Sequence, residues 1–419
     1  MNKRTFLKKA AFAGLGGVLS FESFAGVVKN VASLPITDLA GDEDFWTKVR
    51  QYYKLKPDYI NLENGYYNFV PEPVLEKFIE HVREVNYHGS YFMRNYRVKT
   101  RRAMAAKLAE VAGCSADELT ITRNTTESLD LVIGGLNWKR GDEAVFAEQD
   151  YGSMRGMFSQ ISKRYGVVNR VVSVPNIPKS DEEIVNLYAS VITKRTKLLM
   201  VSHMINITGQ ILPVRKICDM AHSKGVQVLV DGAHSLAQFR FSIEELDCDY
   251  FGSSLHKWMS VPLGCGLLYV KKEHIGKVWP LMAEGGKPSE DITRLSHIGT
   301  NPVHTDLAIS AAIEFYNMLG AERKESRLRY LQNYWTSKVR ELPHVILNTP
   351  ADPARACAIA TVGIKGIKPA DLATTFFDKY KIFTVGIDGS GVNGCRITPN
   401  VYTSTDELDV LVNALKELK

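Results

Sequence analysis

The sequence predicts an α/β protein with a mostly parallel central sheet flanked by helices, and a smaller α+β domain at its C-terminal end. Strand and helix signals alternate from about residue 58 to about residue 300, as in strand–helix–strand units. The alternation loosens after Thr300, where longer helical stretches follow. With 419 residues, 45% of them hydrophobic, the chain can bury a large core and form two domains.

The individual elements follow from hydrophobic periodicity and from the glycines that end helices. Expected strands lie at 118–124, 143–148, 168–174, 196–204 and 226–234. Expected helices lie between and around them at 104–113, 125–136, 154–166, 180–193 and 213–225, the last with Pro213 in its first turn. Further helices are expected at 306–320 and at 403–419, where acidic residues come early and lysines late.

These elements divide the chain into a large domain over residues 58–304 and a C-terminal part over residues 305–419. The C-terminal part begins with a linking helix near residues 305–335 and continues as the small domain. Residues 27–57 are expected to form an N-terminal linker or arm.

The first 26 residues have the architecture of an export signal rather than of a fold element. A basic start is followed by an apolar stretch too short to span a membrane, and then by small residues. The segment "NKRTFLKK" is similar to a twin-arginine motif in which Lys3 replaces the first arginine. We therefore expect export to the periplasm; the alternative is the disordered start of a cytoplasmic protein.

Charge and cysteine content exclude several classes of protein. The net charge is +6, of which the first 26 residues contribute +3, so nucleic acid is not an expected partner. No stable membrane span is expected. The six cysteines are scattered without a CxxC pair, which favours buried thiols over a metal site.

Chemically functional residues follow five of the strands. These groups lie at 122–127, 150–151, 203–206, 231–234 and 254–257. Ligands of open parallel sheets bind at the carboxyl ends of the strands, so five such groups predict a single pocket. Lys257 is flanked by apolar segments, which fits either an extended side chain with its charge in water or a buried amine with a lowered pKa.

Four features of this predicted pocket match one cofactor. The turn "TRNTTES" could bind phosphate at a helix N-terminus, although, taken alone, a simple helix cap by Asn124 or Thr125 is the favoured interpretation. Asp231 ends an apolar strand and needs either local backbone donors or a protonated ring nitrogen as its partner. Tyr151 could stack on a ring or belong to the core. Together with Lys257, which could form a Schiff base, they are what pyridoxal phosphate requires.

The motifs "TRNTTES", "DYG", "SHMINITGQILPV", "DGAH", "SSLHKW", "GT" and "RITPNVY" occur in an order that resembles class V aminotransferases of pyridoxal-phosphate fold type I. The resemblance covers nearly all of the chain after residue 58. Within the class, "DGAH" and "SSLHKW" are most similar to isopenicillin N epimerase-like proteins.

This resemblance implies a role for each matching residue. Lys257 would form the Schiff base and Asp231 would pair with the pyridine nitrogen, while Tyr151 would stack on the ring. Asn206 and His234 would lie near the ring hydroxyl. The phosphate would be held by Thr125, Thr126, Ser254 and His256.

Two further segments carry implied roles. Gly299 and Thr300 match a segment that reaches the phosphate across a dimer interface in this family, which implies a homodimer. Arg396 matches the arginine that binds the α-carboxylate of an amino-acid substrate, with a surface arginine as the alternative.

The resemblance leaves the reaction open. Lys257 would move the α-proton, and the outcome could be transamination, epimerisation or elimination by a C–S or β/γ-lyase. The loop "TVGIDGSGVNG" lacks the cysteine of desulfurases, and Cys395 directly precedes Arg396, so sulfur transfer is not expected.

Alternatives of other kinds also remain. A non-catalytic binding protein on the same fold is one; a dehydrogenase is discounted because no GxGxxG follows a strand. The residues that could read the substrate side chain are Tyr66, Tyr67, Arg94 and Arg97, each with a core or surface role as the alternative.

Overall fold

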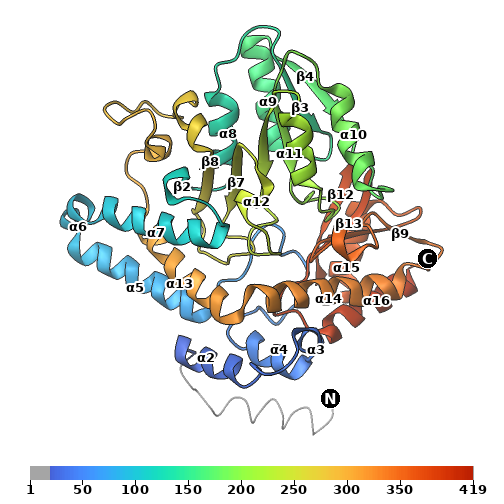
Figure 1. Cartoon of the computed structure of the whole chain (residues 1–419). Helices are drawn as coiled ribbons and strands as arrows, with labels where there is room; N and C mark the ends of the chain where they lie inside the picture. Colours follow the sequence, from blue (N-terminus) through green and yellow to red (C-terminus); the bar gives the residue numbers. More distant parts are fainter. Residues whose placement is uncertain (1–18, 419) are drawn as a thin grey trace.

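A seven-stranded sheet forms the centre of the protein in the computed structural model, which describes residues 19–418 (Figure 1). Its strand order is β2-β8-β7-β6-β5-β3-β4, and only β8 runs antiparallel to its neighbours. The strands are β2 (Leu119–Thr122), β3 (Glu143–Ala147), β4 (Val168–Val172), β5 (Thr196–Ser202), β6 (Gln227–Asp231), β7 (Tyr250–Ser254) and β8 (Gly266–Val270). The predicted mostly parallel sheet is confirmed.

Helices cover both faces of this sheet, which explains why its inner strands are buried and largely apolar. Leu229 packs on the face covered by α8 and α9, whereas its neighbours Val228 and Val230 pack on the face covered by α10 and α11. The helices of the large domain are α5 (Glu72–His88), α6 (Ser90–Asn95), α7 (Arg97–Ala112), α8 (Thr125–Gly135), α9 (Gly152–Tyr165), α10 (Asp181–Val191), α11 (Val214–His222) and α12 (Ile243–Leu246). Pro213 directly precedes α11 instead of lying in its first turn.

The C-terminal part forms an α+β unit with its own core. Its antiparallel sheet has the order β12-β13-β10-β9, built from β9 (Val345–Leu347), β10 (Ala360–Ile364), β12 (Val385–Gly389) and β13 (Val392–Ile397). The helices that accompany it are α14 (Ala321–Val339), α15 (Pro369–Tyr380) and α16 (Thr405–Glu417). A second, parallel pair joins β1 (Ile60–Asn61) to β11 (Ile382–Phe383), which ties the start of the large domain to this unit.

The region near residues 305–335, where a linking helix is expected, contains more than one helix. Two helices, α13 (Val303–Leu319) and α14, span this region and are separated at Gly320. Gly320 has φ +88°, a left-handed conformation that glycine adopts without the penalty of a side chain. The glycine therefore ends α13 and redirects the chain into α14 along the small domain.

From residue 19 onward, the N-terminal segment contributes three helices, α2 (Phe21–Lys29), α3 (Ile36–Ala40) and α4 (Glu43–Arg50). Most of the predicted export signal lies outside the described residues. Its last part, however, is a fold element: Phe24 is fully buried and stacks on Phe315 of α13, with 4.1 Å between ring centroids. Among residues 19–418, no helix has the length and apolar character needed to cross a membrane.

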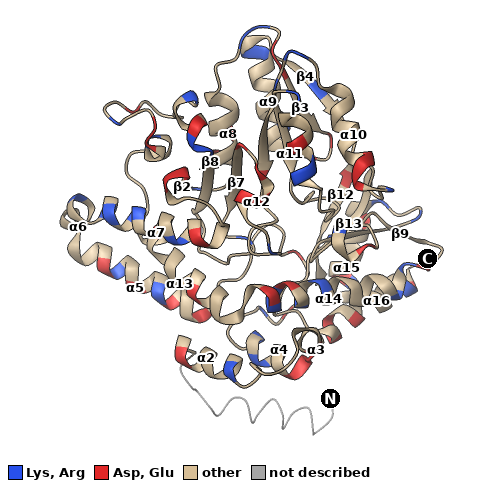
Figure 2. Cartoon of the chain, viewed as in Figure 1, with Lys and Arg blue, Asp and Glu red and all other residues tan. Residues whose placement is uncertain are grey.

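Basic and acidic residues are both distributed along the ribbon in Figure 2, in keeping with the small net charge. The helix α7 carries several arginines and lysines.

Candidate active site

An open cavity of about 1340 Å³ lies at the carboxyl ends of the strands. The strand register explains its position, because Ser202 of β5 pairs with Asp231 of β6, which in turn pairs with Gly252 of β7. The three strands therefore end at the same edge of the sheet. Of the predicted site residues, those that line the cavity are Thr125, Thr126, Tyr151, Asn206, Asp231, His234, Ser254, His256, Lys257 and Arg396.

Lys257 follows β7 and directs its amine into this cavity. Desolvation by burial lowers the pKa of the amine to about 8, with Asp231 and Glu63 opposing and Arg396 adding to that shift. Of the two interpretations that the sequence allowed, the buried amine is the one that the structure has. A fraction of this lysine is uncharged near neutral pH, as a nucleophilic amine requires.

His234 is the polar neighbour of the Lys257 amine, with 3.0 Å between His234 Nε2 and Lys257 Nζ. On its other side, the indole N–H of the fully buried Trp258 donates to His234 Nδ1 at 3.4 Å. Burial lowers the pKa of His234 well below its ordinary value, so the imidazole is neutral. With Nδ1 accepting, the proton of the neutral imidazole is on Nε2, where it can donate to the uncharged form of the Lys257 amine.

Asp231 ends β6 at the floor of the cavity and is buried. Its Oδ1 accepts the backbone N–H of Ala233 at 2.9 Å, so the local backbone satisfies part of the carboxylate. Burial raises the pKa of Asp231, while that backbone donor and Lys257 lower it. A cationic group in the cavity would stabilise the charged form of this acid.

A second buried acid, Asp150, lies behind this floor. It accepts hydrogen bonds from the Ser202 hydroxyl and the Ala147 amide, each at 2.7 Å. Burial, with a contribution from Asp231, raises the pKa of Asp150 to about 7. Two neighbouring buried carboxyls favour having one of them protonated, and Asp150 is the one that does not line the cavity.

The N-terminus of α8 forms another wall. Asn124 is its N-cap and accepts the Glu127 N–H at 2.9 Å, so the capping interpretation of "TRNTTES" is confirmed. The next residues face the cavity as well: the hydroxyls of Thr125 and Ser254 are 2.7 Å apart, and the Thr125 amide donates to Ser254 Oγ at 2.8 Å. A helix N-terminus with several hydroxyls suits a phosphate group.

Arg396 of β13 lines the opposite wall, and its guanidinium already has a carboxylate partner. Nη2 and Nε of Arg396 both donate to Glu63, the Nε contact at 3.3 Å, and Nη1 donates to the Asn206 carbonyl at 3.4 Å. Both side chains of the ion pair are nearly buried, with 9% of Arg396 and 7% of Glu63 exposed. The sequence analysis did not identify Glu63.

Of the four residues that could contact the substrate side chain, only the two tyrosines lie at or beside the cavity. Tyr66 lines the cavity, and Tyr67 lies beside it with its ring centroid 6.5 Å from that of His256. Arg94 is exposed on α6, and Arg97 donates to the Gly299 carbonyl at 3.2 Å, outside the cavity. Neither arginine lies where it could read a substrate side chain within this chain.

Thr300 also lies outside the cavity, and it is exposed. Its predicted contact involves a second subunit, so its role stays a prediction. The apolar residues of the wall, which the sequence analysis missed, are Met154, Met204 and Leu263. Their hydrophobic character alone does not separate them from core residues.

The residues of this cavity fit pyridoxal phosphate. The hydroxyls and the helix N-terminus suit its phosphate, Asp231 suits its ring nitrogen, and Lys257 suits its aldehyde. The Nδ1 atom of His256 is buried without a hydrogen-bond partner among the described residues, so a polar group remains to be satisfied at the phosphate end.

None of the six cysteines lines the cavity, although all of them lie within residues 19–418. Cys395 precedes Arg396 in β13, is fully buried, and contacts the Pro369 carbonyl at 3.5 Å. Burial raises the pKa of the Cys395 thiol to about 12, so it is not a thiolate near neutral pH.

The chain is similar to several known proteins. The isopenicillin N epimerase of Amycolatopsis lactamdurans is 26% identical over 392 residues, covering 89% of this chain and 98% of the relative. The cysteine desulfurase of Haloferax volcanii is also 26% identical, covering 85% and 88%. The cystine C–S lyase C-DES, solved with glycine covalently linked to its pyridoxal-phosphate cofactor, superimposes with a TM-score of 0.78 at 20% identity, covering 88% and 99%.

The family comparison extends over most of the chain. The sequence pattern described as Aminotransferase class-V matches residues 70–409, which include nearly every residue of the cavity. The fold is that of pyridoxal-phosphate enzymes of fold type I. The protein therefore belongs to the class V aminotransferase family of pyridoxal-phosphate enzymes.

Proposed function

We propose that the protein acts at the α-carbon of an amino acid, or of a small molecule that carries an amino-acid group, as an epimerase or an aminotransferase. One observation carries the proposal: Lys257, Asp231 and Arg396 come from three separate elements and line one cavity. A binding protein has no need of a buried amine with a lowered pKa beside a carboxylate-binding arginine.

Each of these residues has a defined task in such a reaction. Arg396 would bind the α-carboxylate of the substrate and orient its α-carbon toward Lys257. Lys257 would hold the cofactor covalently and, once released by the substrate amine, move the α-proton as a general base. Asp231 would keep the ring nitrogen protonated. Bound pyridoxal phosphate supplies a conjugated ring that takes up the electrons left at the α-carbon.

A second candidate is elimination by a C–S or β/γ-lyase. The relatives that act on cysteine and cystine favour this option. A desulfurase that carries sulfur on its own cysteine is disfavoured, because no cysteine lines the cavity formed by the described residues. Elimination needs no such thiol, since the leaving group departs from the substrate itself.

The first experiment is the visible absorption spectrum of the purified protein and of Lys257→Ala, before and after borohydride. We expect a yellow wild-type protein that becomes permanently labelled at Lys257, and a variant that cannot be labelled. A protein that stays colourless with added pyridoxal phosphate contradicts the proposal and favours a non-catalytic binding protein.

The reaction type is then decided with amino acids in deuterated water. Epimerisation gives inverted product carrying deuterium at the α-carbon, whereas transamination consumes the amino acid and forms a keto acid. Elimination releases the side-chain leaving group and gives a keto acid with ammonia. Each amino acid is run beside Lys257→Ala to correct for reactions of free cofactor.

We also propose that the active protein is a homodimer. The exposed Thr300 and the exposed apolar side chains Trp279, Leu281 and Met282 support this proposal. Light scattering should give twice the mass of one chain, and Thr300→Val should weaken the binding of pyridoxal phosphate. A monomer that retains the cofactor fully contradicts this proposal.

Export of the protein also remains a proposal, supported by the basic and apolar start of the sequence. Because Phe24 is buried against Phe315, we expect any cleavage to occur before Ser20, the N-cap of α2. Mass spectrometry of protein from cell fractions tests both points. A chain starting at Ser20 should keep its stability, and one starting at Val27 should lose about 3–5 kcal/mol from the missing Phe24.

A further inference from the structure

The guanidinium of Arg396 is shared between the protein and the cavity. An arginine carries five N–H donors, in two forks that each match a carboxylate. Glu63 takes the fork formed by Nε and Nη2, and the Asn206 carbonyl takes one donor of Nη1. This leaves one N–H on Nη1 and one on Nη2 for a ligand.

Glu63 holds this arginine from behind. Arg396 lines the cavity, whereas Glu63 does not, although the two side chains are in contact. Gly65 lies against the same guanidinium, because a Cβ on this residue would lie 2.7 Å from Cζ and Nη2 of Arg396. The backbone of Gly65 is therefore packed directly against the guanidinium.

The segment that carries Glu63 is fixed on the strand end that carries Arg396. Glu63 forms an isolated parallel bridge with Thr398. The amides of the next two residues, Asn64 and Gly65, donate to the Thr398 hydroxyl at 2.6 and 3.1 Å. The Asn64 side chain donates to the Thr398 carbonyl at 2.7 Å. Glu63 is thus part of the architecture rather than a movable latch that a substrate displaces.

From this geometry we infer that Glu63 is a positioning residue that sets the ligand specificity of Arg396, restricting it to planar carboxylates that fit the two remaining N–H groups. The negative charge of Glu63 also compensates the positive charge of the Arg396 guanidinium. Anions that do not match the two remaining N–H groups are therefore only weakly attracted to this site. The inference rests on the proposed function, in which Arg396 binds the substrate α-carboxylate.

The test compares the binding of propionate and sulfate to the holoprotein by calorimetry, in a buffer without phosphate. Bound cofactor fills the phosphate end of the cavity, so sulfate reports on Arg396. We expect the wild-type protein to bind planar propionate more tightly than sulfate. In Glu63→Gln the ratio of these two affinities should fall about tenfold, because the freed N–H donors and the uncompensated charge of Arg396 allow a tetrahedral anion to bind.

A second readout uses the chain freed of cofactor. Glu63 raises the pKa of Lys257, so Glu63→Gln should lower the pH midpoint at which an amine-specific reagent modifies Lys257. The conservative variant Glu63→Asp keeps the charge but has a shorter side chain, so it should keep the Lys257 midpoint and lose part of the preference for propionate. The matched control is Glu72→Gln, a buried glutamate paired with Lys54 and remote from the cavity, which should change neither.

The inference is overturned if Glu63→Gln keeps the wild-type preference for propionate over sulfate. It is also overturned if the affinities for both anions fall equally while the Lys257 midpoint is unaltered, because a purely structural role of Glu63 would give that result. If Glu63→Gln does not fold, Glu63→Asp alone decides, since its shorter side chain must relax the preference in part. Failure of the proposed function looks different, because the wild-type protein then takes up no cofactor at Lys257.

Discussion

The two walls of the cavity are built in different ways. On the sheet side, Asp231 and Lys257 follow neighbouring strands, and the register of β6 and β7 brings them together. On the small-domain side, Glu63 and Arg396 meet although 333 residues separate them in the sequence. The sheet wall follows from local strand pattern, whereas the other wall depends on long-range contacts between the N-terminal segment and the small domain.

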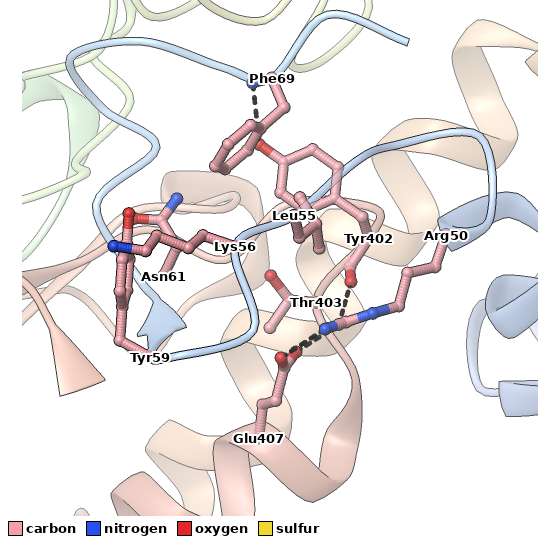
Figure 3. Close-up of a pocket in the computed structure, with 9 residues that line it drawn as sticks. All are labelled: Arg50, Leu55, Lys56, Tyr59, Asn61, Phe69, Tyr402, Thr403 and Glu407. Atoms are coloured by element: carbon pink, nitrogen blue, oxygen red, sulfur yellow. Dashed lines mark hydrogen bonds and ion pairs between the residues drawn. The ribbon is translucent and has the colours of Figure 1, made fainter. Parts of the chain in front are cut away.

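On the small-domain side, the second wall of the cavity, buried polar contacts position the residues, whereas strand pairing positions them on the sheet side. The Tyr402 hydroxyl donates to Asn64 Oδ1 at 2.6 Å. It also accepts a hydrogen bond from the Phe69 amide at 3.4 Å (Figure 3). Arg50 of α4 forms an ion pair with Glu407 of α16 in the same region (Figure 3). These contacts hold the segment carrying Glu63, so this wall can be perturbed without disturbing the sheet.

The largest effect is expected on the sheet wall. Asp231→Asn removes the charge that would keep the cofactor nitrogen protonated, and should slow α-proton exchange by about 10²–10⁴-fold. Exchange of amino-acid α-protons in deuterated water measures this rate, and borohydride labelling of Lys257 shows that the cofactor is still attached. A rate near that of wild type would contradict the role assigned to Asp231.

The matching change on the second wall is Gly65→Ala. Its methyl group would displace the Arg396 guanidinium, and a misplacement of that kind costs up to about 10²-fold in reaction rate. Cofactor uptake should stay normal, because Lys257 and Asp231 are untouched. Gly152→Ala is the control, since a Cβ there meets nothing within 4 Å. If Gly65→Ala loses the cofactor as well, the two walls are not independent.

A smaller effect is expected from pH. Free amine is the reactive form of Lys257, and its pKa is lowered to about 8, so cofactor attachment should rise with pH and level off above that value. Below it the rate should fall about tenfold per pH unit. Absorbance after adding pyridoxal phosphate to cofactor-free protein follows the attachment. A midpoint near that of an ordinary lysine would show that the amine is solvated.

The smallest effect is expected from Cys395→Ala, next to the carboxylate-binding arginine. The buried, protonated thiol faces the small-domain core, so activity on any substrate should stay within about twofold of wild type, apart from a stability cost of about 1 kcal/mol. Steady-state rates with cysteine and with a sulfur-free amino acid provide the comparison. A selective loss with cysteine would restore the desulfurase interpretation.

The sequence anticipated the sheet wall better than the second wall, for a physical reason. Parallel strands must end at one edge, so an acid after one strand and a lysine after the next can be placed together from the pattern alone. The pairing of Glu63 with Arg396 leaves no local signal, because it depends on how the segment 62–65 docks on Thr398. The role of Arg97 stays a prediction for the same reason: α7 directs it to Gly299 and not into the cavity of its own chain.

The N-terminal boundary shows the same limit. A short apolar run followed by small residues is typical of an export signal, and this pattern does not reveal that Phe24 packs against Phe315. By contrast, the helix expected at 306–320 stops at the same glycine as α13, because a glycine after a periodic segment is a helix stop signal that can be read from the sequence alone.

The burial of the cysteines has a consequence for the surroundings in which the protein can work. All six are free, and burial raises the pKa of each thiol, so disulfide exchange and peroxide have little thiolate to attack. The fold contains no disulfide that an oxidant would have to form, and burial protects its thiols without a reductant. The cysteines by themselves therefore favour neither an oxidising nor a reducing environment.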